Sequence, residues 1–227
     1  MVQRFGASYP AMLSPGNNLW PLKLVEALYN SARDIAASES SGTKLSLCLH
    51  TQTPVTAVNR IQETSSAKAR RYSLSTPRGL ITCSYVLHAT NAYVSHLLPH
   101  MAGPDGVVPT RGQVIATRAK VTSDVLTTVA GSANEDYEYW FPRPVRNGSV
   151  TGRADEEVPL VILGGGREVT LPEGESYVTD DSTLNPSVSQ FLRDFLPRTF
   201  PGRYESGHEP EMEWVSFFHV TSLGIVV

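Results

Sequence analysis

The spacing of apolar residues changes along this chain from the period of a helix to the period of a strand, which restricts it to folds that combine both elements. Between Leu19 and Ile35, apolar residues recur at intervals of three and four, which places them on one face of a helix. Pro21 suits the first turn of that helix, and Trp20 is expected to pack against the core at its entrance. Over residues 44–50, leucine instead occupies every second position, which is the pattern of a strand. A helix followed by strand pairs predicts an α/β or α+β layered fold.

A hairpin and a short apolar strand are predicted next. The segments 71–76 and 80–85 alternate between apolar and polar residues, and the intervening Pro77-Arg78-Gly79 has the composition of a turn. Residues 85–89 are predicted as a further short strand that ends abruptly at Thr90-Asn91.

The second half of the chain is predicted to add more strands and a second long helix. Asn185 precedes that helix and is a residue type that caps helix N-termini. We expect a short helix over 92–98, strands over 107–119 (broken near Pro109), 137–143 and 160–164, and the second helix over 186–195. These elements describe one α+β body with two lobes.

Composition excludes several classes of protein. The chain has 227 residues and a formal net charge of −3, so neither a nucleic-acid polyanion nor an anionic membrane is an expected partner. No apolar run approaches the roughly 18 residues that a membrane-spanning helix needs, and no apolar secretion signal follows Met1. Two cysteines, Cys48 and Cys83, are too few for a disulfide scaffold. We therefore expect a cytoplasmic chain.

Metal and hydrolase chemistry have little support in the sequence. His96 and His100 have the spacing of a helical pair, but Pro99 lies between them and no third ligand is near. The chain has no G-x-S-x-G motif, so a nucleophilic hydrolase is not indicated.

Two other features leave alternatives open. Gly164-Gly165-Gly166 follows an apolar strand, so it is either a turn or a wall that a ligand approaches closely. Tyr139 and Phe141 share one face of their strand. A core role is the default for such residues, but a tyrosine with Arg143 nearby can also hold a carboxylate.

The order of several short segments is similar to that of a known family. These segments are 19–25 (LWPLKLV), 51–55 (TQTPV), 88–93 (HATNAY), 108–113 (VPTRGQ), 139–143 (YWFPR) and 161–166 (VILGGG). Together they resemble the FAD-dependent oxidoreductases of the D-amino-acid oxidase family (glycine/sarcosine oxidase-like and DadA-like), fungal members in particular. The resemblance extends to about Trp214.

The resemblance implies a partial FAD/NAD(P)-binding Rossmann-like lobe over 1–106, a mixed-sheet substrate lobe over 107–180, and a helix and return segment over 181–227. It implies that the backbone of Val55 and the turn formed by Ala89, Thr90 and Asn91 contact FAD. It also implies that Tyr139 and Arg143 contact a small amine or amino-acid substrate. The family chemistry is hydride transfer from the carbon beside the amine to the flavin.

The sequence departs from the family at both ends. It contains no G-x-G-x-x-G, the glycine turn that supplies the main pyrophosphate site of such enzymes. Residues 215–227 replace the family's glycine-rich closing segment, and we expect this tail to derive from an unspliced intron. We therefore expect a fragment, truncated at both ends, that binds FAD poorly. The alternative is a non-catalytic binding or dimerisation module that self-associates through an exposed edge strand.

Overall fold

The computed structural model describes residues 19–38, 45–61, 70–122, 125–126, 130–133, 137–143, 158–172, 174–221 and 224–226. The chain divides into two compact units, residues 15–88 and residues 89–227. Both contain helices and antiparallel sheet, which confirms the α+β class. The expected lobe boundaries at 106/107 and 180/181 stay predictions. No helix among the described residues is long and apolar enough to cross a membrane.

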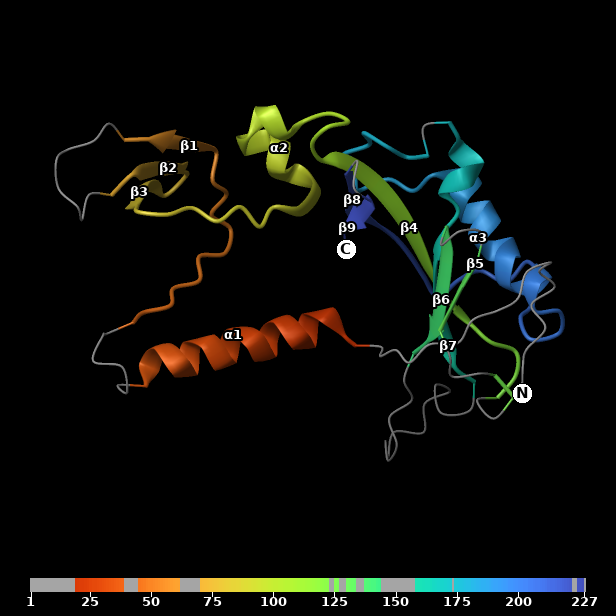
Figure 1. Ribbon diagram of the computed structural model, residues 1–227. Coiled ribbons are helices and arrows are strands. Elements are labelled where there is room, and N and C mark those ends of the chain that lie inside the picture. The colour runs from red at the N-terminus through yellow and green to blue at the C-terminus, as the bar shows by residue number, and fades with distance from the viewer. Residues whose placement is uncertain are drawn as a thin grey trace. The chain divides into compact units, whose positions relative to one another are not determined.

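The first unit contains a helix and a small antiparallel sheet of order β1-β2-β3 (Figure 1). Its elements are α1 (Pro21–Ala37), β1 (Ala57–Arg60), β2 (Tyr72–Thr76) and β3 (Gly79–Cys83). β2 and β3 form the hairpin that the sequence predicts. Gly79 at its turn has a φ of +114°, a conformation that only glycine adopts readily.

α1 has the predicted apolar face, but that face is not buried. None of its residues is buried, and Trp20 is 52% exposed, so the expectation that Trp20 packs against the core is wrong. The Lys23 Nζ instead lies 4.6 Å from the centre of the Trp20 ring. The spacing of apolar residues therefore predicted the helix and its apolar face correctly, but it did not predict whether that face is buried.

Two predicted strands of this region are not paired in the structure. Residues 45–50 and 85–89 belong to no strand ladder among the described residues, and Leu87 is 91% exposed. Alternating side chains suit a strand, but a strand also needs a hydrogen-bonding neighbour. Val55 itself lies just before β1, which begins at Ala57, and the Thr56 N–H donates to the Ser75 carbonyl at 2.9 Å.

The second unit is built on a six-stranded antiparallel sheet of order β5-β6-β7-β4-β8-β9. Its strands are β4 (Val108–Arg118), β5 (Gly131–Ala133), β6 (Glu138–Pro142), β7 (Leu160–Gly165), β8 (Met212–Thr221) and β9 (Gly224–Val226). Its helices are η2 (Asn91–Tyr93), α2 (Val94–Leu97), η3 (Pro99–Met101), η5 (Arg167–Thr170) and α3 (Pro186–Thr199). β4 runs unbroken through Pro109, contrary to the predicted break.

The core of this unit lies between the sheet and α3, which runs along one face of it (Figure 1). Leu192 of α3 and Leu163 of β7 are fully buried. Asn185 caps α3 as predicted, because its side chain accepts a hydrogen bond from the Ser187 N–H at 3.0 Å. The Trp140 ring closes the core against Phe195 and Phe200.

The segment that departs from the family pattern is part of the sheet. The backbone of 215–220 continues β8 and pairs with β4, from Val215 opposite Gln113 to Val220 opposite Val108. The intron origin of this segment concerns the transcript and stays a prediction.

Candidate functional site

The sheet face opposite α3 carries the residues that the sequence assigns to substrate binding. Cross-strand pairing aligns Tyr139 with Gly164, Gly164 with Val114, and Val114 with Trp214. Directly paired residues of adjacent strands point to the same side of a sheet. Because Trp140 packs toward α3, this row of four residues lies on the other face.

Tyr139 lies directly over a glycine in this row. A Cβ atom at position 164 would stand 2.4 Å from both Cζ and Oη of Tyr139. The absence of a side chain at Gly164 therefore lets the tyrosine ring lie flat on the neighbouring strand.

The Tyr139 phenol is placed where it can donate a hydrogen bond to a ligand. Tyr139 is 44% exposed, and the partial burial of its side chain raises the pKa of the phenol above 10.0. The phenol therefore stays protonated at neutral pH and can donate a hydrogen bond from this face.

Arg143 continues the same strand but lies some distance from Tyr139. Its backbone N–H donates to the Leu160 carbonyl at 2.7 Å, which extends the β6–β7 pairing by one residue. At about 3.3 Å per residue, the two Cα atoms are roughly 13 Å apart along the strand. Strand alternation places the two residues on one face, and a shared carboxylate site stays a prediction.

The glycine run acts as a turn and as a close contact between strands. A Cβ at Gly165 would stand 2.4 Å from the Tyr137 carbonyl oxygen, and Gly166 adopts a φ of +77° before η5. Gly164 and Gly165 are the last two residues of β7, so the predicted turn lies at Gly166. The alternative interpretation, a wall that a ligand approaches closely, stays a prediction.

The predicted cofactor turn contains a buried polar atom. The Thr90 hydroxyl oxygen is buried and has no hydrogen-bond partner among the described residues. Beside it, Asn91 has a φ of +48° and donates from Nδ2 to the Phe217 carbonyl at 3.2 Å. Asn91 therefore ties this turn to β8, while Ala89 opens the turn and is exposed.

Val55, the other predicted cofactor residue, belongs to the unit 15–88, whereas the 89–91 turn belongs to the unit 89–227. Val55 is half-buried and lies just before β1. Its assignment to FAD stays a prediction.

Sequence patterns missed the polar network that holds β4 against α3. Gln113 donates to the Ser189 hydroxyl and to the Glu213 carboxylate, each at 2.7 Å, and accepts from the Asn185 N–H at 2.9 Å. The Arg111 guanidinium pairs with Glu175. The three partners of Gln113 are 72 to 100 residues away from it in the sequence, so local sequence patterns give no signal for this network.

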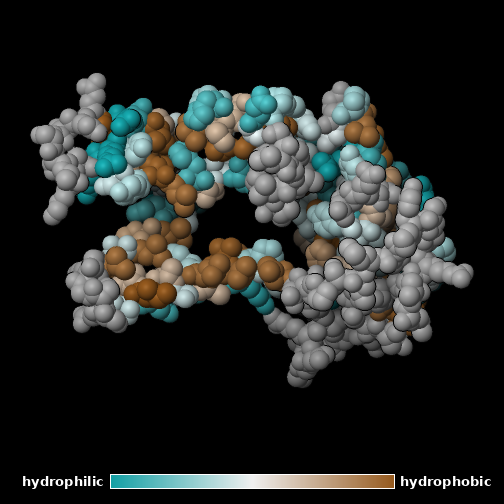
Figure 2. All heavy atoms as spheres, viewed as in Figure 1, coloured by the Kyte–Doolittle hydropathy of each residue, from teal (hydrophilic) through white to brown (hydrophobic). Residues whose placement is uncertain are grey.

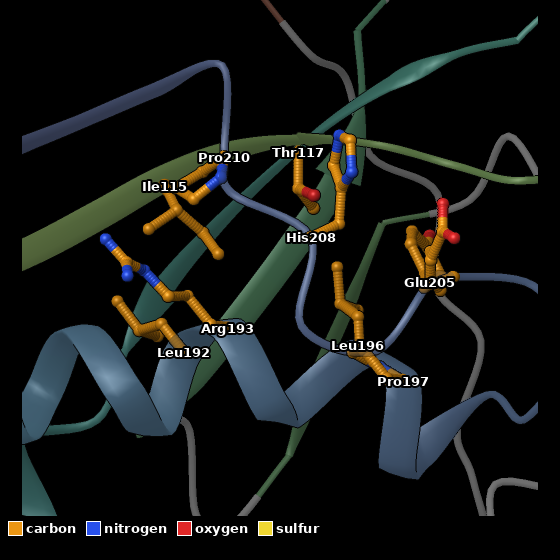
Figure 3. A pocket seen from close by; sticks show the side chains of 10 residues that line it. Ile115, Thr117, Leu192, Arg193, Leu196, Pro197, Glu205, His208 and Pro210 are labelled. Carbon is orange, nitrogen blue, oxygen red and sulfur yellow. The ribbon is translucent and has the colours of Figure 1, made fainter.

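A hollow opens on the α3 side of the same sheet (Figure 3). Ile115 and Thr117 of β4 face Leu192 and Leu196 of α3 across it, and His208 lies at its side. This hollow lies on the face opposite Tyr139. Among the described residues, no group of three or more His, Cys, Asp or Glu side chains is placed to hold a metal ion.

Comparison with known proteins gives little further information. No family model matches the chain, and no curated protein matches it. Among solved structures, the anhydrotetracycline hydroxylase OxyS from Streptomyces rimosus matches with a TM-score of 0.37 and 14% identity. The match covers 86% of this chain and 32% of that chain, so this chain spans about a third of its length. A likeness of this size carries no inference about function.

Proposed function

We propose that this chain is a fragment of an FAD-dependent amine or amino-acid oxidoreductase of the D-amino-acid oxidase family. The observation that carries the proposal is the Tyr139 phenol, which rests on Gly164 and is directed from the sheet face opposite α3. Tyr139 is one of the two residues that the family resemblance assigns to substrate binding.

The residues present fit a flavin in part. The Thr90 hydroxyl is buried without a partner among the described residues, which suits a polar contact from a bound group, since such atoms are otherwise paired in folded proteins. The sequence, however, contains no G-x-G-x-x-G, so the helix N-terminus that usually holds a pyrophosphate is missing. Affinity for FAD is therefore expected to be low.

When bound, FAD supplies the hydride acceptor for oxidation of the amine. The chain's own contribution is to position the substrate and limit water. The Tyr139 phenol donates a hydrogen bond to a substrate carboxylate or carbonyl oxygen. Val114 and Trp214 lie in the same row, on β4 and β8, and give this face an apolar continuation beyond Gly164.

The proposal is tested by titrating the full chain with FAD and following the flavin absorbance and fluorescence. A saturable, weak interaction is expected, and Thr90→Val is expected to weaken it several-fold because it removes the buried hydroxyl. Ser95→Ala, a nearby change of similar size, is the control. Absence of any saturable change in the wild-type chain contradicts the proposal, and a stoichiometric yellow complex contradicts the low affinity.

A second test addresses the substrate. Benzoate and short aliphatic carboxylates, as amino-acid analogues, are expected to perturb the absorbance of Tyr139, and Tyr139→Phe removes the perturbation. Perturbation that survives in Tyr139→Phe contradicts the assigned role of the phenol.

The alternative is a non-catalytic binding or dimerisation module. The observation that favours it is α1, whose apolar face has no buried residue. Proteins rarely expose contiguous apolar surface without a partner.

A further inference from the structure

The border of the large sheet defines a partner more closely than the exposed apolar side chains of α1 do (Figure 2), because its backbone hydrogen-bonding groups have fixed directions. Most of that border is β8. β9 covers residues 219–221, and the Asn91 side chain donates to the Phe217 carbonyl. Residues 212–216 have no strand on their outer side among the residues that the structure describes.

The pairing of β4 shows which backbone groups of β8 point outward. The Arg111 N–H donates to the Glu175 carbonyl at 3.1 Å, on the edge of β4 that does not pair with β8. Alternate residues of a strand bond to opposite edges, so the even-numbered residues of β4 bond to β8. Because Thr110 is paired with Phe218, the even-numbered residues of β8 bond to β4. Its odd-numbered residues therefore direct their N–H and C=O groups outward.

The contact with Asn91 agrees with this assignment, since the Phe217 carbonyl that it reaches belongs to an odd-numbered residue. Within the stretch 212–216, the outward residues are Glu213 and Val215. Each contributes one N–H and one C=O to the border of the sheet. An incoming strand can pair with these groups.

A second copy of β8 has the groups that these residues need. In an antiparallel pair with its two-fold axis at Trp214, Glu213 of each copy is opposite Val215 of the other. Each such pair exchanges two hydrogen bonds, so the two pairs use the outward N–H and C=O of all four residues. Trp214 is also the centre of the stretch 212–216, so this register aligns the whole stretch with itself.

Neighbouring registers with the same direction fit less well. An axis at Val215 places Glu213 opposite Phe217, whose carbonyl already accepts a hydrogen bond from a side chain. An axis at Glu213 places Val215 opposite Glu211, whose N–H already donates to β4 at 2.8 Å. The groups that are already bonded at both ends of the stretch therefore favour the axis at Trp214.

The side chains of the stretch suit this pair. The two copies of Trp214 meet at a non-hydrogen-bonded position, where side chains on adjacent strands are closest. Met212, which is 63% exposed, lies opposite Ser216 of the other copy on the same face. The Glu213 carboxylate lies on the α3 side, where it accepts from Gln113, so it brings no unpaired charge to the junction.

We propose that residues 212–216 of β8 bind the same residues of a second copy of this chain, as an antiparallel strand pair centred on Trp214. The pair joins two six-stranded sheets into one. It gives the dimerisation alternative a specific interface and does not depend on the proposed flavin chemistry, so the outcome of the FAD titration does not affect it.

Cysteine cross-linking tests the register. Met212→Cys and Ser216→Cys are each made in a chain that carries Cys48→Ser and Cys83→Ser. Position 212 of one copy and position 216 of the other lie opposite each other, within reach of a disulfide. Like positions are four residues apart along the pair, about 14 Å. Under mild oxidation, a mixture of the two variants is expected to form a linked dimer much faster than either variant alone.

Sedimentation of the full chain over a range of concentrations tests the hydrogen bonds. The wild-type chain is expected to be a dimer in equilibrium with monomer. Val215→Pro removes an outward N–H, and hence two hydrogen bonds of the pair, but none of the bonds to β4. Val215→Ala also shortens the side chain but keeps the N–H. The proline variant is expected to have a dissociation constant about tenfold above that of the alanine variant.

The outcomes separate this pair from other associations. Preferential cross-linking in the mixture supports the pair, whether or not the proline variant folds. Equal cross-linking in the mixture and in the single variants overturns it. So does a wild-type chain that stays monomeric, or folded proline and alanine variants with the same dissociation constant.

Discussion

At the scale of single residues, the second unit depends on a few contacts between positions far apart in the sequence. The clearest is the packing of Tyr139 on Gly164, where a methyl group would occupy the space of the ring. The second is Gln113, whose side chain is satisfied on both its amide nitrogen and its oxygen. Each contact can be tested by a single substitution.

Gly164→Ala is expected to destabilise the chain by about 1–3 kcal/mol, because the new Cβ displaces the Tyr139 ring. Denaturant unfolding measures the change. In a Tyr139→Ala background the same substitution is expected to cost much less, since the clash is gone. Equal costs in the two backgrounds contradict the packing.

Gln113→Leu is expected to cost about 2–4 kcal/mol, because the Asn185 N–H and the Ser189 hydroxyl lose a buried partner. Gln190→Leu is the matched control. The side chain of this exposed glutamine on α3 donates to Asp194 at 3.1 Å, and the substitution is expected to change the free energy of unfolding by no more than about 0.5 kcal/mol. Similar unfolding midpoints for the two variants show that the network is not stabilising.

Asp180 is expected to titrate unusually low. Hydrogen bonds from the Ser182 and Thr183 hydroxyls and from the Ser182 N–H lower the pKa of its carboxyl from 3.8 to about 2. Because the folded pKa is the lower one, the stabilisation is complete above about pH 4 and is lost as the pH falls toward 2. NMR titration measures the pKa, and Ser182→Ala is expected to move it back toward 3.8. A wild-type value near 3.8 shows that these bonds do not form in solution.

At the scale of elements, local signals predicted some helices and strands well and others poorly. The cap at Asn185 and the apolar face of α3 are local features, and both were predictable. So was the β2–β3 hairpin, because its turn residues lie within it. The pairing of residues 45–50 and 85–89 depends on a neighbouring strand, which alternation alone does not reveal.

The same distinction applies to the candidate site. Strand alternation predicted that Tyr139 and Phe141 share a face, but not that Gly164 lies beneath the ring, because that contact depends on the register between β6 and β7. The Gln113 network was not predictable, since its members come from three separate parts of the chain.

Asn185→Ala is expected to destabilise α3 by about 1–2 kcal/mol, because the Ser187 N–H loses its cap. The same side chain also donates to Glu175 at 2.7 Å, which in turn pairs with Arg111. Circular dichroism during thermal unfolding measures the loss. Asn185→Ser keeps a capping oxygen without placing a second carboxylate beside Glu175 and is expected to retain more of the stability. An alanine variant as stable as wild type contradicts the role of the cap.

At the scale of the whole molecule, the two units differ in how their apolar residues are used. The unit 89–227 has a packed core between sheet and helix. In the unit 15–88, residues such as Leu47, Leu80 and Leu87 are exposed. Local stability is expected to follow this difference.

Hydrogen exchange checks this expectation. The amides of β4 and β7, which are paired and buried, are expected to exchange slowly. The amides of 45–50 and 85–88, which belong to no described ladder, are expected to exchange within seconds. Slow exchange in these two segments indicates that they acquire a partner in solution.

The outermost strands of the large sheet have a consequence for its behaviour at high concentration. β9 pairs only with residues 219–221 of β8, so residues 212–218 of β8 have no strand ladder on their outer side among the described residues, although Asn91 donates to the Phe217 carbonyl there. A row of amides and carbonyls at a sheet border can pair with an incoming strand. The large sheet is therefore expected to recruit strands from other copies of the chain along β8 as the concentration rises.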